Sequence, residues 1–106
     1  MTTNYYSIGS IEECLVQVGR VVIIEGQEIA IFRTSDGNVY AVANKSPHPK
    51  GGPLAEAIVS GHYIYDPLYD WKIDLTNGAV QAPDKGQVAT YPVIVKNKDI
   101  QIGFYA

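Results

Sequence analysis

The sequence predicts a single all-β domain, and three observations support this prediction. Short segments rich in Val, Ile and Tyr alternate with turn residues about every eight to twelve positions, a spacing typical of antiparallel sandwiches and barrels. The 106 residues, 46% of them hydrophobic, are enough for one domain with its own core, spanning 1–106. The chain contains no repeat, low-complexity tract or inter-domain linker.

The N-terminal region is predicted to form a short strand over 4–7 and then a helix. Ser10-Ile11-Glu12-Glu13 matches a capping box, with a hydroxyl at the N-cap and a carboxylate three residues later. A helix of about two turns is expected to follow and to end near Gly19. Cys14, the single cysteine, is expected there as a small buried apolar side chain. One cysteine excludes an internal disulfide and a cluster bound only by thiolates of this chain.

An antiparallel meander is predicted next. Apolar, β-branched residues fill 21–25, 28–33 and 39–43, separated by turns at 26–27 and 35–38. The segment 44–55 then breaks this pattern with three prolines and two glycines, which stiffen the backbone and permit positive φ angles. A loop of this length in a small domain usually has a function.

The remaining segments are predicted to be short strands. They cover 58–61, 63–65 and 71–75, and Thr76-Asn77-Gly78 is a hairpin turn with a return arm over 79–81. A last hairpin joins 88–95 to 100–104. Pro92 lies inside its first strand, which indicates a sheet edge or a bulge.

Charge and hydropathy exclude several classes of function. The net charge is −3 and the eight Lys and Arg residues are scattered, so the basic surface that nucleic acids require is not expected. The N-terminus lacks a basic region followed by an apolar core, so no signal peptide is expected. The longest aliphatic run, 21–24, is too short to cross a bilayer. We therefore expect a cytoplasmic protein that binds neither nucleic acid nor membrane.

Several motifs, in this order, resemble the Rieske-type ferredoxin domain over nearly the whole chain. They are Phe-Arg-Thr-Ser-Asp-Gly-Asn-Val-Tyr-Ala-Val at 32–42, Ser-Pro-His at 46–48, Gly-Pro-Leu-Ala at 52–55, Asp-Pro-Leu-Tyr at 66–69, Trp-Lys-Ile-Asp-Leu-Thr-Asn-Gly at 71–78 and Tyr-Pro-Val at 91–93. The resemblance implies an all-β, Rieske-like antiparallel sandwich or barrel of short strands with one short N-terminal helix.

The resemblance also identifies four positions at which Rieske proteins hold a 2Fe–2S cluster. Two loops supply Cys-x-His and Cys-x-x-His, so that two thiolates bind one iron and two imidazoles bind the other. The corresponding residues here are Ser46, His48, Asp66 and Tyr69, with 17 residues between His48 and Asp66. Only one histidine of the four ligands remains. These four are therefore vestigial ligand positions.

The ligand chemistry argues against a cluster. A hydroxyl and a carboxylate are poor ligands for soft cluster iron, and Tyr69 would have to ionise to bind it. A mononuclear site built from His48, His62 and Asp66 is the alternative, although nothing in the sequence brings the two histidines together. Instead we expect Tyr69 to fold into the vacated space, and Ser46 or His48 to hydrogen-bond to Asp66. The chain itself is predicted to carry no catalytic residues, no cofactor and no metal.

Within the Rieske fold, the missing ligands resemble the small subunit of assimilatory NAD(P)H-dependent nitrite reductase. This resemblance implies a partner, a large subunit that carries FAD, a 4Fe–4S cluster and sirohaem and that reduces nitrite to ammonia in nitrate assimilation. The chain would then be an accessory subunit of an oxidoreductase. Two alternatives remain open: a Rieske-type ferredoxin that carries electrons in a dioxygenase system, and a stand-alone interaction module.

The tips of the two loops are the predicted docking surface for a partner. In ligand-bearing Rieske domains these tips face the electron partner, and their geometry does not depend on the cluster alone. Stiff loops lose little conformational entropy on binding. The candidate docking residues are Pro47, His48, Pro49, Gly51, Pro67 and Leu68.

Overall fold

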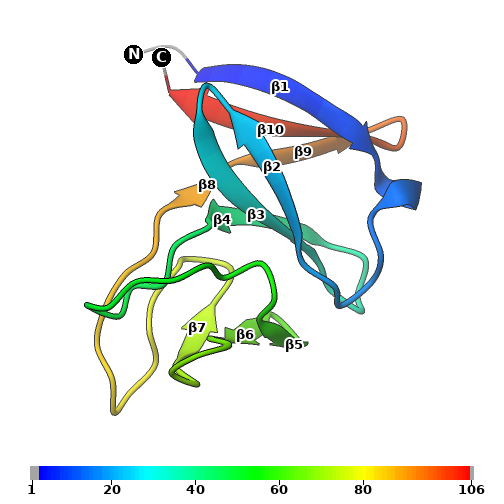
Figure 1. Ribbon diagram of the computed structural model, residues 1–106. Coiled ribbons are helices and arrows are strands. Elements are labelled where there is room, and N and C mark those ends of the chain that lie inside the picture. The colour runs from blue at the N-terminus through cyan, green and yellow to red at the C-terminus, as the bar shows by residue number, and fades with distance from the viewer. Residues whose placement is uncertain (1–2, 106) are drawn as a thin grey trace.

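The computed structural model describes residues 3–105, which form three antiparallel sheets stacked in layers (Figure 1). The first sheet has the strand order β1-β10-β9, the middle sheet β2-β3-β4-β8 and the third sheet β5-β6-β7. The strands are β1 (Thr3–Ser10), β2 (Arg20–Ile24), β3 (Gln27–Arg33), β4 (Val39–Ala43), β5 (Ile58–Ser60), β6 (Tyr63–Tyr65), β7 (Lys72–Asp74), β8 (Thr90–Tyr91), β9 (Val93–Lys96) and β10 (Asp99–Tyr105). The predicted all-β architecture of short antiparallel strands is confirmed.

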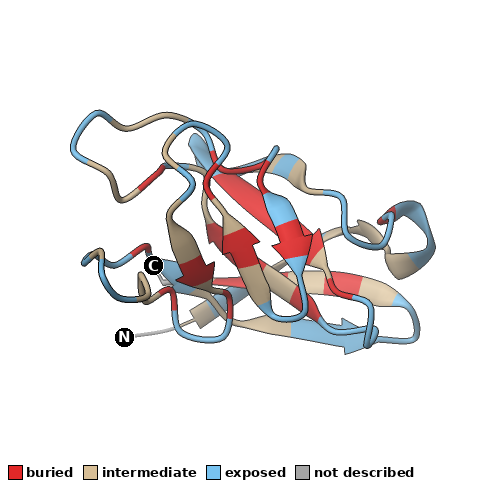
Figure 2. Ribbon diagram, turned by 90° about the horizontal axis from the view of Figure 1, so that it is seen from below, coloured by how far each residue is buried: buried red, intermediate tan, exposed pale blue. Residues whose placement is uncertain are grey.

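The middle sheet is buried on both faces, which explains the continuous apolar run in β3. Because successive side chains of a strand point to opposite faces, Ile29 and Ile31 pack with Ile100 and Ile102 of the first sheet. Ala30 and Phe32 pack on the other face against side chains of the third sheet. Two separate cores result, and Figure 2 shows the buried residues concentrated along the central strands. The expected meander of β2, β3 and β4 is confirmed, with bounds within two residues of those predicted.

The predicted two-turn helix does not form. Ser10 and Glu13 make both bonds of the capping box, but the helix is a 3-10 turn, η1 (Ile11–Glu13). Tertiary contacts compete with the next helical turn, because Arg33 Nη1 donates to the carbonyls of Ile11 at 3.1 Å and Cys14 at 3.3 Å. The backbone N–H of Gln17 also donates to the carbonyl of Arg33 at 2.7 Å. The chain after Cys14 is therefore held at the end of β3, where Val16 bridges to Arg33 and a turn follows at Gln17.

The predicted strand 88–95 is two strands in different sheets. β8 pairs with β4 in the middle sheet, whereas β9 pairs with β10 in the first sheet. Pro92 separates them, and its carbonyl accepts a hydrogen bond from Gly103 N at 2.8 Å. Proline lacks the N–H that a continuous ladder requires, so it marks the point where the chain crosses between sheets. The predicted edge or bulge at Pro92 is in fact this crossing.

The predicted return arm over 79–81 is not a regular strand either. Val80 makes an isolated bridge to Ile73, and Ala79 makes another to Gln87. The segment 82–89 then runs back past the first proline-rich loop before entering β8. Within residues 3–105, no helix is long and apolar enough to cross a membrane.

Candidate functional site

Two loops meet beside the third sheet, and each contributes one fully buried polar side chain. The first loop covers residues 44–55 and the second covers 66–70. Ser46 and Asp66 are each only 3% exposed. Ser46 Oγ donates a hydrogen bond to Asp66 Oδ2, which joins the two loops directly. Burying a carboxylate is costly unless it is hydrogen-bonded, so this contact explains how the fold tolerates Asp66.

The other polar atoms of this pair are also used within the protein. Asp66 Oδ1 accepts from the backbone N–H groups of Leu68 at 2.8 Å and Tyr69 at 3.1 Å. Ser46 Oγ accepts from the backbone N–H of His48 at 3.1 Å. Each side chain therefore folds its own loop into a turn while it bonds to the other loop, a local pattern that Ser and Asp favour.

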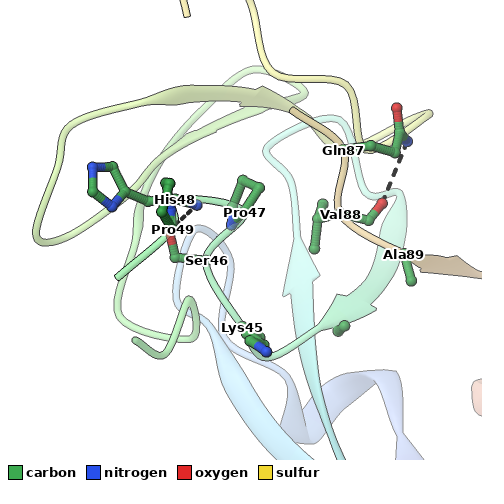
Figure 3. A pocket seen from close by; sticks show the side chains of 9 residues that line it. Lys45, Ser46, Pro47, His48, Pro49, Gln87, Val88 and Ala89 are labelled. Carbon is green, nitrogen blue, oxygen red and sulfur yellow. Dashed lines mark hydrogen bonds between the residues drawn. The ribbon is translucent and has the colours of Figure 1, made fainter. Parts of the chain in front are cut away.

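A second pair of side chains joins the loops by ring stacking. The rings of His48 and Tyr69 are 3.7 Å apart between centroids and nearly parallel, at 8°. Trp71 packs against the same imidazole at 4.9 Å with an interplanar angle of 58°. His48 Nδ1 accepts from Lys50 N at 3.1 Å, so in the neutral ring the proton lies on Nε2. In Figure 3 the imidazole points away from the hollow beside Pro47.

The four vestigial positions thus form two contacts between the loops, which we call the loop clasp: Ser46 with Asp66, and His48 with Tyr69. The predicted bond from Ser46 to Asp66 is present. Tyr69 is partly buried as expected, but it lies on the histidine ring. Trp71, which follows the second loop, contacts the imidazole of His48 in the first loop.

The residues of the clasp do not fit a 2Fe–2S cluster. Such a cluster requires two thiolates and two imidazoles, and this site offers a hydroxyl, a carboxylate, a phenol and one imidazole. The hydroxyl, both carboxylate oxygens and Nδ1 of the imidazole are already engaged in hydrogen bonds.

The alternative mononuclear site is not assembled. His62 Nε2 lies 3.8 Å from Asp74 Oδ2, and its ring packs on Tyr63. It does not join His48 and Asp66. Across residues 3–105, no group of three His, Cys, Asp or Glu side chains is arranged to hold a metal ion.

The loop tips form a largely apolar surface with charges of both signs beside it, from Lys45 and Lys50 in the first loop and Asp70 in the second. Leu68 is 65% exposed, while Pro47, His48 and Gly51 are half-buried and Pro49 and Pro67 are exposed. Gly52 lets the two loops approach closely, because an added Cβ there would lie 3.0 Å from Leu68 Cδ1. The segment 44–55 carries two lysines and no acidic residue.

A hollow of about 390 Å³ lies beside the first loop (Figure 3). One wall is formed by residues 45–49 and the other by Gln87, Val88 and Ala89, with Ala43 between them. The sequence did not indicate the second wall. In the structure, this second wall begins after Gly86, where the chain passes close to the first loop: an added Cβ would lie 3.3 Å from Pro47 and 3.7 Å from Trp71.

Cys14 is a buried side chain of the core, as expected. Burial raises the pKa of its thiol, and the positive charges of Arg20 and Arg33 only partly oppose this shift. Both arginines come near Cys14 through the fold. The thiol is protonated and inaccessible, which is the opposite of a reactive cysteine.

Comparison with known proteins places this geometry in context. Residues 4–103 match the family described as the Rieske-like 2Fe–2S domain. The ferredoxin component of the naphthalene 1,2-dioxygenase system of Pseudomonas putida is 30% identical over 82 residues, 76% of this chain and 77% of that protein.

Two solved structures are also similar. One is a proposed NADH-dependent nitrite reductase small subunit of Mycobacterium tuberculosis, with a TM-score of 0.90 and 23% identity over 100% of this chain and 99% of that one. The other is the NAD(P)H nitrite reductase small subunit of Erwinia carotovora, with a TM-score of 0.77 and 25% identity over 96% of this chain and 82% of that one.

Proposed function

The chain belongs to the Rieske-like 2Fe–2S domain family, and from this premise we propose that it is a cluster-free accessory subunit of an assimilatory NAD(P)H nitrite reductase. One observation carries the proposal: at all four positions where the family binds its cluster, side chains of this chain bind one another. The chain would support a large subunit in the cytoplasm that holds FAD, a 4Fe–4S cluster and sirohaem and reduces nitrite to ammonia.

The loop clasp supports this role because it supplies order without a metal. In a Rieske protein the cluster crosslinks two loops that would otherwise be held only by backbone turns. Here the bond from Ser46 to Asp66 joins the loops in the protein interior, and the stack of His48 on Tyr69 joins them nearer the surface. The docking tip can therefore be rigid before the partner arrives, which reduces the entropy lost on association.

The chemistry of the tip suits a protein partner. Leu68 presents an apolar side chain that is 65% exposed, and the preceding Pro67 restricts the backbone there. A few well-packed residues supply most of the binding energy in many interfaces. We propose that Pro47, His48, Pro49, Gly51, Pro67 and Leu68 contact the large subunit.

A second function has one observation in its favour. The ferredoxin component of the naphthalene dioxygenase system is 30% identical to this chain, and such a relationship favours an electron carrier for an oxygenase. A carrier, however, needs a redox centre, and the donors at Ser46, Asp66 and Tyr69 do not fit one. Iron and acid-labile sulfide analysis of the purified protein separates the two functions, since a carrier contains both and an accessory subunit neither.

The proposed function is tested by affinity capture from cells grown on nitrite, followed by mass spectrometry and absorption spectroscopy. We expect a large flavin- and sirohaem-containing reductase in near-stoichiometric yield. Capture of an oxygenase, or of no reductase, would refute the assignment.

A matched pair of variants tests the docking surface in the same experiment. Leu68→Asp places a charge at the tip and is expected to reduce recovery of the reductase at least tenfold. Leu15→Asp is the control, because Leu15 is 67% exposed and Leu68 65%, and Leu15 lies between η1 and β2, outside both loops. Equal recovery with both variants would show that the tips are not the docking surface.

A further inference from the structure

The strand β2 is an unprotected edge of the middle sheet. Within residues 3–105, the sheet order ends at β2, which pairs only with β3. Its sequence Arg-Val-Val-Ile-Ile contains four consecutive β-branched apolar residues with no proline and no bulge. Free strand edges offer unpaired backbone groups to other strands, and proteins usually block them with charges, prolines, bulges or short length.

The other outer strands in the described part of the chain each carry such a device. β1 has a register shift between Ser7 and Gly9. β9 follows Pro92 and ends in Lys96. β5 is three residues long and β8 two, and β7 is bridged on its outer side by Val80, which pairs with Ile73. Of these devices β2 has only a charge at its first residue, Arg20, which leaves the four residues from Val21 to Ile24 without one.

The register of β2 shows which of its groups face outward. A two-residue turn joins β2 to β3, and Ile24 is opposite Gln27. The pair that flanks such a turn is hydrogen-bonded and the bonding alternates along the ladder. Consequently Val22 bonds to β3, whereas the N–H and C=O groups of Val21 and Ile23 point away from the sheet.

The side chains of the same two residues are exposed. Val21 is 42% exposed and Ile23 is 69% exposed. They lie on the face of the middle sheet that also carries Ala30, since Val21 is opposite Ala30 in the register. The third sheet covers Ala30 but leaves most of Ile23 uncovered. Outward backbone groups and an uncovered apolar face thus coincide at Val21 and Ile23.

We propose that β2 pairs with β2 of a second copy of this chain, in an antiparallel dimer that joins two middle sheets into one. The strand is self-complementary. Two-fold antiparallel pairing sets Val21 of one copy opposite Ile23 of the other, so all four outward groups on each edge find partners. The charges agree with this direction at long range, because Arg20 begins the strand and Glu25 follows its end. Within each copy the partly buried Arg20 guanidinium donates to the Ile8 carbonyl and the Glu25 carboxylate accepts from Tyr6, so no direct ion pair across the dimer is implied. Antiparallel pairing brings the basic end of one copy to the acidic end of the other, whereas parallel pairing would place like charges together.

This dimer is independent of the proposed function and leaves the loop tips free. The tips belong to segments that flank the third sheet, whereas the paired edge belongs to the middle sheet (Figure 1). Because the paired strands are only five residues long, the interface is small, and we expect association in the micromolar to high-micromolar range.

Sedimentation velocity on the full chain over a concentration series tests the dimer. The unchanged protein should shift from monomer to dimer as concentration rises. Ile23→Lys, which adds a charge to the edge, should raise the dissociation constant at least tenfold. Ile94→Lys is the control, because Ile94 is also an exposed apolar residue on an outer strand, and it should leave association unchanged. Thermal unfolding of both variants checks that each is folded.

Amide hydrogen exchange provides the second measurement. The amides of Val21 and Ile23 should become protected as concentration rises, while the amide of Val22, already bonded to β3, should not change. A protein that is monomeric at all concentrations, or a dimer that survives Ile23→Lys, would overturn the proposal. Concentration-independent exchange at Val21 and Ile23 would also overturn it.

Discussion

Removal of one hydroxyl, in Ser46→Ala, is the sharpest test of the loop clasp. The hydroxyl donates to a carboxylate that is 3% exposed. A hydrogen bond to a charged group contributes about 1.5–3 kcal/mol, and a buried acceptor left without its donor costs about as much. We therefore expect the free energy of unfolding to fall by about 2 kcal/mol.

The matched control is Ser7→Ala. Ser7 Oγ donates to Asp99 Oδ1 at 2.5 Å in an exposed setting, so the residue type and the carboxylate acceptor are the same. Ser46 differs in being buried and in also accepting from the backbone N–H of His48. Solvent replaces an exposed bond, and surface substitutions usually change stability by less than about 0.5 kcal/mol. At about 4 °C per kcal/mol for a domain of this size, Ser46→Ala should lower Tm by about 8 °C and Ser7→Ala by about 2 °C or less.

Urea unfolding and differential scanning calorimetry measure both variants. Hydrogen exchange should also increase at the amides of His48, Leu68 and Tyr69, which bond to Ser46 or Asp66, and stay unchanged in the strands. Equal destabilisation by the two variants would refute the reasoning, since burial of the bond would then have no consequence. So would loss of stability in Ser46→Ala without faster exchange in the loops.

Two further predictions concern cysteine chemistry. If the loops keep cluster geometry, the triple variant Ser46→Cys, Asp66→Cys, Tyr69→His should take up iron and sulfide and become coloured on reconstitution, whereas a folded, colourless variant would show that the loops have moved apart. Burial raises the pKa of Cys14 in the folded protein, so the unfolded thiol releases its proton at lower pH. Stability should therefore decline as pH rises above about 8.5, the unfolded value. Cys14→Ala should remove that part of the decline in urea titrations at several pH values, and an unchanged pH dependence would contradict the assignment.

The strands of the middle sheet could be predicted because their signal is local. Val39–Ala43 has the bounds that the apolar pattern indicated, and the flanking turn at 35–38 is fixed by Asp36, which accepts from Asn38 N at 3.2 Å. The helix after Ser10 could not be predicted correctly, although its capping box is present. Arg33, about twenty residues away, donates hydrogen bonds to two backbone carbonyls of that segment. Local helix propensity contains no information about such a distant donor.

The sequence predicted which residues of the candidate site lie close together, but not the geometry of all their contacts. A buried carboxylate requires a donor, so polarity predicted that Asp66 bonds to Ser46 or His48, and the structure shows that the donor is Ser46. The stacking of Tyr69 on His48 did not, because it depends on the direction of two rings. That direction is set by the backbone turns at Leu68 and Lys50, which only the folded loops define.

The clasp also explains how a domain of this family can retain its loop geometry with most of its cluster ligands replaced. The substitutions are complementary across the two loops. Ser46 supplies the hydrogen-bond donor for the Asp66 acceptor, and Tyr69 supplies an aromatic ring that stacks on the retained His48. A hydroxyl without the carboxylate, or a carboxylate without the hydroxyl, would leave a buried polar atom unpaired. The pair at 46 and 66 is therefore stable only as a unit. That unit joins the two loops directly, so under the proposed function the shape of the tip is the property that these replacements preserve.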